Sequence, residues 1–249
     1  MTTRLSIQPR KALIILLSIA LLMSVLAVVG ILVEMTFDVE TDGKDGNPYI
    51  WPIVRQFSFV EEGNIANFYQ GLQLVFASVL LLVIWRGKVQ RREPFRGHWL
   101  VLAGIFLFLG MDEIAQIHET TIAIEIVTYR GHEGDKTSWF WVYLPLAAIF
   151  GLSYLRFLRR LPRRIAGLMM ASGMIYIMGV VVLEKFVNWY AGKHSDGSIG
   201  YLILDNLSEF TEGAGIALFI YTLLTYLAET GEEIAFRLTQ TPDRERASG

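Results

Sequence analysis

The feature that most constrains this chain is a series of six long apolar runs separated by clusters of charged residues. A helix of about 20 mostly apolar residues crosses a hydrocarbon core about 30 Å thick. The runs cover residues 11–35, 66–85, 99–118, 139–158, 165–190 and 207–227. Of the 249 residues, 53% are hydrophobic and 18% are charged, whereas an ordinary soluble domain has about 25% charged residues. We therefore predict an all-α fold, a polytopic membrane protein built as a bundle of six transmembrane helices.

The domain organisation predicted from this pattern is simple. Residues 1–230 form one six-helix membrane domain, and residues 231–249 form a polar cytoplasmic tail. The first run follows the basic residues Arg4, Arg10 and Lys11, as in a signal peptide, but it is long and lacks a small-residue cleavage site. We interpret it as a retained signal anchor.

The orientation follows from the charged residues that flank the runs, because Lys and Arg accumulate on the cytoplasmic side. With six alternating spans, 16 of the 22 basic residues and 6 of the 24 acidic residues fall on the side of the termini. That side then carries a net charge of +10 and the opposite side −12. We expect a multi-pass protein of a bacterial-type plasma (inner) membrane, with both termini in the cytoplasm.

Composition and motifs also exclude several function classes. The chain has no cysteine, so it has no disulfide, no thiolate zinc site and no cysteine nucleophile. It carries no nucleotide or flavin motif, and its basic clusters do not suggest nucleic-acid binding. The bilayer is the expected partner, with anionic lipid at the cytoplasmic basic loops 86–96 and 156–164. A homo-oligomer and a membrane-complex partner both stay open.

Acidic residues within the runs point to a functional site, because ionisable side chains in a membrane cost about 2.5–3.5 kcal/mol each. At about 100° per residue, Asp112, Gln116 and Glu119 share one stripe of the third span. His118 stands beside that stripe, and Glu113 points to the other flank. In the sixth span, Asp205, Glu209 and Glu212 share a stripe in the same way. The two stripes lie toward the outer ends of their helices.

Two further spans bring polar residues to a similar depth. Glu184 and Asn188 lie four residues apart in the fifth span, and Asn67 and Gln70 share a face of the second. Ser208 lies beside the sixth-span stripe, where Asp205 is also a candidate helix cap. We predict a polar cavity open to the outer side, where carboxylates and one histidine meet. The candidate ligands of a divalent metal ion of unknown identity are Asp112, His118, Glu119, Glu184, Glu209 and Glu212, and the expected cavity-lining residues are Asn67, Gln70, Gln116, Asn188, Asp205 and Ser208.

Three functions are compatible with this pattern. The first is binding of a cation or proton, coupled to transport or sensing, with Asp112 and Glu212 as the deepest acids. The second is a membrane-embedded, metal-dependent, hydrolase-like enzyme acting on a lipid or lipid-linked substrate at the outer leaflet, with His118 or Glu113 as the catalytic general base. The third is a non-catalytic subunit or assembly partner in a membrane complex.

Overall fold

The fold is described from a computed structural model, in which residues 3–4, 7–37, 50–59, 63–117, 148–149, 151–194, 198–231 and 235–236 are described. Within these ranges the architecture is helical. The helices are α1 (Pro9–Phe37), α2 (Trp51–Val54), η1 (Arg55–Phe57), α3 (Ile65–Gln90), α4 (Arg96–Ala115), α7 (Arg163–Ile177), the π-helix η2 (Met178–Leu183), α8 (Glu184–His194) and α9 (Ile199–Thr230). Residues 148–149 and 151–158 are also helical.

Five helices in the described part of the chain are long and apolar enough to cross a membrane. They are Pro9–Thr36, Ile65–Gln90, Arg96–Ala115, Arg163–His194 and Ile199–Thr230. They match five of the six predicted spans, with different ends. Half of the predicted span 139–158 lies outside the described residues, and its described part, 148–149 and 151–158, is helical. The described part of the chain is thus almost entirely helical, with several candidate membrane spans.

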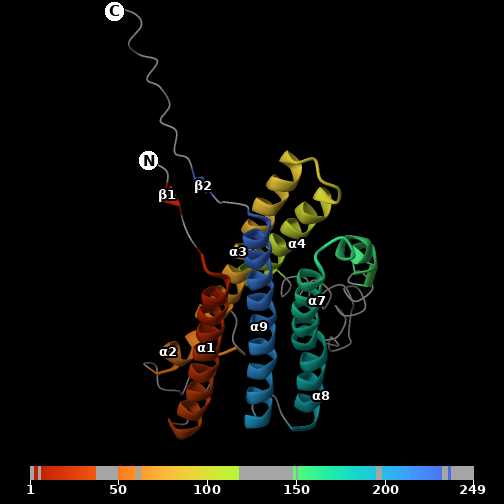
Figure 1. Cartoon of the computed structure of the whole chain (residues 1–249). Coiled ribbons are helices and arrows are strands. Elements are labelled where there is room, and N and C mark those ends of the chain that lie inside the picture. Colours follow the sequence, from red (N-terminus) through yellow and green to blue (C-terminus); the bar gives the residue numbers. More distant parts are fainter. Residues whose placement is uncertain are drawn as a thin grey trace, which may run out of the picture.

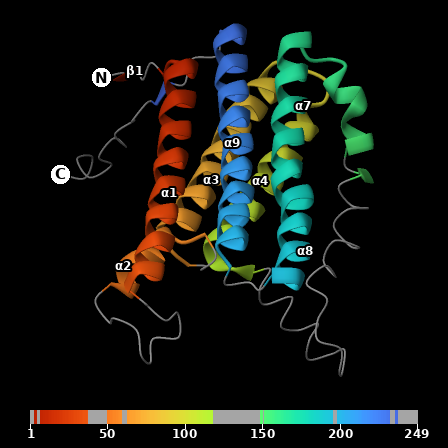
Figure 2. The ribbon, with the colours of Figure 1, turned by 90° about the horizontal axis from the view of Figure 1, so that it is seen from below.

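Helix α9 is the central helix of the bundle. It packs against α1 on one side, α7 and η2 on the other, and α3 behind. Figure 1 and Figure 2 both show α1, α9 and the α7–α8 rod side by side, with α9 in the middle. Helices α3 and α4 form a closely packed hairpin, in which a Cβ at Gly110 would lie 3.0 Å from the backbone oxygen of Gly71. The position of α9 lets its side chains reach every other long helix, including α4, where Phe106 stacks on Phe219 of α9.

Local sequence explains where two of these helices begin. The Asn64 side chain accepts hydrogen bonds from the backbone amides of Ala66 and Asn67, at 2.9 and 3.1 Å, and caps α3. The Ser198 side chain caps α9 by accepting from the amide of Tyr201. The sequence had suggested Asp205 as a candidate cap of this helix. Asp205 instead lies within the second turn of α9. The helix starts earlier than predicted because Ser198 supplies the cap.

The apolar core is concentrated where α3 ends and α4 begins. Trp99, 2% exposed, stacks on Tyr226 of α9 and meets the edge of Phe157. The hydroxyl of Tyr154 donates to the backbone oxygen of His98 at 2.8 Å. The helical residues 151–158 are thereby fixed against the start of α4. The end of α3, the start of α4 and the end of α9 consequently lie together at one end of the bundle.

The two ends of the chain pair with each other near the same end of the bundle (Figure 1). Strand β1 (Thr3–Arg4) pairs antiparallel with β2 (Ala235–Phe236), with Thr3 opposite Phe236 and Arg4 opposite Ala235. The sequence had suggested only a polar tail over residues 231–249. At residues 235–236 the structure has a short strand instead, because β1 offers a pairing partner.

Candidate functional site

Two amide side chains of α3 hold carboxylates from two different helices. The Asn67 amide nitrogen donates to Glu113 of α4 at 3.2 Å. One turn further along, the Gln70 amide nitrogen donates to Glu209 of α9 at 2.8 Å. Asn67 and Gln70 are both buried. The predicted face of the second span therefore contacts carboxylates of α4 and α9.

More carboxylates surround these two hydrogen bonds. Glu209 interacts electrostatically with Glu113, Asp205 and Glu184. Glu212 interacts with Glu209 and with the same three carboxylates. We call Glu113, Glu184, Asp205, Glu209 and Glu212 the carboxylate cluster. Like charges in a low-dielectric interior repel strongly, so protons or a cation are needed to stabilise such a group.

Tyr176 of α7 interacts electrostatically with residues of the carboxylate cluster. It interacts electrostatically with Glu212, Glu113, Glu209 and Asp112. Its backbone packs so closely on α9 that a Cβ at Gly215 would lie 2.8 Å from the Tyr176 amide nitrogen. Tyr176 thus brings a phenol beside the carboxylates.

The π-helix η2 joins the fifth span to the cluster. The Ser208 hydroxyl donates to the backbone oxygen of Gly179 at 3.0 Å. A Cβ at Gly179 would lie 3.0 Å from the backbone nitrogen of Glu212 and would collide with its side chain. Single π-helical turns are common at functional sites. This one brings the backbone of the fifth span against Ser208 and Glu212 and is followed directly by Glu184.

Four buried polar atoms in the described residues lack a hydrogen-bond partner, and all belong to α3 or α9. They are the side-chain oxygen of Asn67, one carboxylate oxygen of Asp205, and both amide atoms of Gln73. Asn67 is 9% exposed and Gln73 3% exposed. The Tyr69 hydroxyl lies near Gln73 but donates its hydrogen bond to the backbone oxygen of Leu16 at 2.6 Å. An unpaired buried polar atom costs about 1–3 kcal/mol, which favours a bound water molecule or ion.

The arrangement of α4 differs from the sequence expectation. The spacing had placed Asp112, Gln116 and Glu119 on one stripe and Glu113 on the other flank, yet Glu113 is the residue that contacts Asn67. The physical reason is that Gly110 and Ile114 of α4 pack against Gly71 of α3, which turns the face that includes Glu113 toward α3. In addition, α4 ends at Ala115, and Gln116 adopts a left-handed conformation with φ of 55°. Helical spacing therefore does not continue through Gln116, whose side chain lies beside Gly63.

The remaining predicted residues are placed as follows. Asp112 contributes to the electrostatic surroundings of Tyr176. Asn188 is partly buried one turn beyond Glu184 on α8. His118 and Glu119 lie outside the described residues. The metal-ligand and general-base roles predicted for His118 thus stay predictions.

Electrostatic interaction between carboxylates does not by itself bring them close enough to chelate one metal ion together. Within the described ranges, no three His, Asp or Glu side chains converge closely enough to hold a metal ion together. The described carboxylates are instead distributed along α4, α8 and α9, and two of them, Glu113 and Glu209, each accept a hydrogen bond from an amide of α3. Such an arrangement is suited to holding protons, or a cation bound partly through water.

Sequence reasoning missed three residues of this region. Tyr176 and Gln73 gave no signal, because one uncharged polar residue in an apolar run is common. Glu34 of the first span was passed over, although an acid near the end of an apolar run is the same signal that identified Glu212. The structure places Glu34 and Asp205 at one small cavity between α1 and α9.

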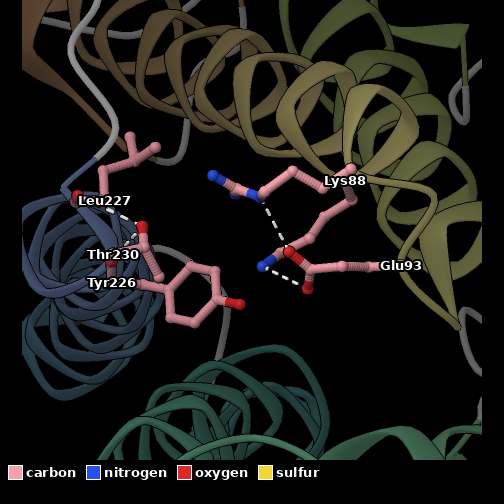
Figure 3. Close-up of polar contacts among 6 residues, drawn as sticks. Lys88, Glu93, Tyr226, Leu227 and Thr230 are labelled. Carbon is pink, nitrogen blue, oxygen red and sulfur yellow. Dashed lines mark hydrogen bonds and ion pairs between the residues drawn. The ribbon is translucent and has the colours of Figure 1, made fainter.

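A second polar group lies at the opposite end of the bundle (Figure 3). The Lys88 ammonium, on a side chain 6% exposed, donates to Glu93 at 2.7 Å and lies 5.2 Å from the centre of the Tyr226 ring. Arg91 donates to the other Glu93 oxygen at 2.8 Å. The hydrogen bond from Lys88 lowers the pKa of Glu93 below its ordinary value of 4.5, and Arg91 adds to this effect. This group ties the α3–α4 connection to α9 and contains no unpaired acid.

Comparison with known protein families assigns the chain to one of them. Residues 12–227 match the family described as Domain of unknown function (DUF8692), so the chain belongs to that family. The match includes α1 from residue 12 onward, the three long helices that follow it, and α9 up to Leu227. No curated protein and no solved structure matches the chain.

Proposed function

We propose that this chain is an integral membrane protein that binds a proton or a cation at the carboxylate cluster, coupled to transport or sensing. One observation carries the proposal: Glu113, Glu209 and Glu212 come together from α4 and α9 while only two of them receive an amide hydrogen bond from α3. Charge balance then has to come from bound protons or from a cation.

The unpaired oxygen of Asn67 supports a ligand at this place. The amide nitrogen of Asn67 is occupied by Glu113, whereas its oxygen is buried without a partner. Such an oxygen accepts a hydrogen bond from a protonated carboxyl group or coordinates a hard cation. Protonation or cation binding would satisfy the oxygen and reduce the carboxylate repulsion together.

The six-span topology is part of the proposal. Helices α4 and α7 both begin at the end where Tyr154 bonds His98 and where Arg164 bonds Glu229 at 3.0 Å. The chain therefore has to return along the bundle between them, which supports the sixth span predicted over residues 139–158. With the basic clusters at that end in the cytoplasm, the carboxylate cluster lies toward the outer side.

The test is an infrared titration of the purified protein, combined with thermal unfolding in Na⁺, K⁺, Ca²⁺ and Zn²⁺ separately. We expect a protonated-carboxyl band that titrates with pH, or stabilisation by one cation. A ligand at 100 times its Kd stabilises by about 2.7 kcal/mol. The double variant Glu209→Gln, Glu212→Gln should lose the response.

The matched control is Glu229→Gln. Glu229 lies on the same helix but near the opposite end, where it pairs with the exposed Arg164. This variant should keep the full response. An unchanged titration and unchanged cation dependence in the double variant would contradict the proposal.

A further inference from the structure

A small cavity lies between α1, α2, the loop after η1 and α9, beside the carboxylate cluster. Its walls include Ile31 and Glu34 of α1, Ser58 of the loop, and Leu202 and Asp205 of α9. Its volume is about 20 Å³, and a cavity of about 10–15 Å³ already holds one water molecule. A lipid or another organic ligand does not fit in this space, whereas water and a small inorganic cation do.

Asp205 belongs both to this cavity and to the cluster. It lines the cavity, and one of its oxygens is buried without a hydrogen-bond partner. It also interacts electrostatically with Glu209 and Glu212, which follow it by four and seven residues on the same helix. A proton or small cation on Asp205 is therefore one helical turn from Glu209.

The cavity walls are suited to cations. Glu34 and Asp205 are the two charged residues that line it in the described part of the chain, and both are acidic. The next residue, Asn206, also lines the cavity, and its amide donates to the backbone oxygen of Ser24 at 3.0 Å. This bond fixes α1 against α9 at the inner wall. The cavity therefore combines negative charge, a fixed wall and space for one water molecule.

We infer that this cavity is the entry site through which a proton, or a small inorganic cation, reaches the carboxylate cluster, with Asp205 as the first acceptor. The inference rests on the proposed function, because it requires that the cluster binds the ion. It adds the route, between α1 and α9, and the size limit of the ligand. Asp205 is a transfer residue here, and Glu209 and Glu212 are the destination.

Because the chain contains no cysteine, the entry site can be tested by introducing single cysteines and modifying them with a thiol reagent. Leu202→Cys places a thiol on the cavity wall, and Ile203→Cys places one on the neighbouring residue, which is 48% exposed and does not line the cavity. Each variant is modified with a cationic methanethiosulfonate reagent. Proton uptake after a pH jump is then followed with a pH-sensitive dye. The double variant Glu209→Gln, Glu212→Gln identifies the part of the signal that belongs to the cluster.

We expect modified Leu202→Cys to take up protons about tenfold more slowly, which corresponds to a barrier higher by about 1.4 kcal/mol. Modified Ile203→Cys should match the unmodified protein. Asp205→Asn should slow uptake and Asp205→Glu should restore it, a rescue that a packing role would not give.

The outcomes separate the two proposals. Normal uptake in modified Leu202→Cys and in Asp205→Asn, with the cluster signal intact, would overturn the entry site and leave the proposed function standing. Absence of any proton or cation signal that depends on Glu209 and Glu212 would overturn both.

Discussion

At the residue scale, the contacts between α3 amides and carboxylates are the most directly testable feature. Gln70 is 4% exposed and donates to Glu209 at 2.8 Å. We expect Gln70→Ala to lower the free energy of unfolding by about 1–3 kcal/mol, because the buried Glu209 carboxyl group loses its amide donor. Thermal or denaturant unfolding in detergent measures this. Gln90→Ala is the control, since Gln90 is exposed at the end of the same helix; an equal loss in both variants would rule out a specific role for Gln70.

The Lys88–Glu93 group predicts a pH dependence of stability. Lys88 lowers the pKa of Glu93 in the folded protein from 4.5, so the ionised form of Glu93 stabilises the fold above the unfolded-state pKa. This contribution is lost as the pH falls through the folded-state pKa. Comparing the unfolding of the wild-type protein and Glu93→Gln should show a difference at pH 7 that decreases below pH 4.5.

The expected difference in unfolding free energy between the wild-type protein and Glu93→Gln is small, because Glu93 is partly exposed. Its side chain is 37% exposed, and solvent-screened pairs contribute less than about 1 kcal/mol. Glu229→Gln provides a comparison with a pair in which both partners are exposed. A stability difference for Glu93→Gln that grows as the pH falls would have the wrong sign for the structure.

At the element scale, the π-helix η2 depends on the absence of a side chain at Gly179. Gly179→Ala should destabilise the protein by about 1–3 kcal/mol, because the added methyl group collides with Glu212 and is 3.0 Å from the Ser208 backbone oxygen. Gly173→Ala, on α7 of the same span, has open space around its Cβ. Since alanine favours helix by about 1 kcal/mol over glycine, this control should be neutral or stabilising. Equal unfolding temperatures for the two variants would show that η2 tolerates the added group.

At the scale of the whole molecule, the charge distribution predicts the orientation in the membrane. Gly97 and Gly192 are exposed, lie near opposite ends of the bundle, and have open space at Cβ. In intact cells, an impermeant thiol reagent should label Gly192→Cys and leave Gly97→Cys unlabelled until the membrane is opened. The reverse pattern would place the carboxylate cluster on the cytoplasmic side.

Across the whole molecule, helical spacing predicts which residues share a face only where the helix is continuous. Asp205, Glu209 and Glu212 were expected on one stripe, and α9 runs unbroken through all three. The stripe expected from Asp112 through Gln116 is interrupted because α4 ends at Ala115, and Glu119 lies outside the described residues. Spacing arithmetic is reliable only within a helix, and the sequence carried no glycine or proline signal for that end.

The sequence alone determined that the chain is helical and suited to a membrane. Long apolar runs have to satisfy their backbone hydrogen bonds internally, and a helix does so without reference to the rest of the fold. The sequence also indicated the acids that merit attention, since charged groups in such runs are costly.

Only the tertiary structure decided which of these groups meet. The pairing of Asn67 with Glu113 and of Gln70 with Glu209 depends on how α3 packs between α4 and α9. The cavity shared by Glu34 and Asp205 depends on the packing of α1 against α9. Contacts between helices arise from packing of side chains far apart in the chain, and no local pattern specifies which faces come together.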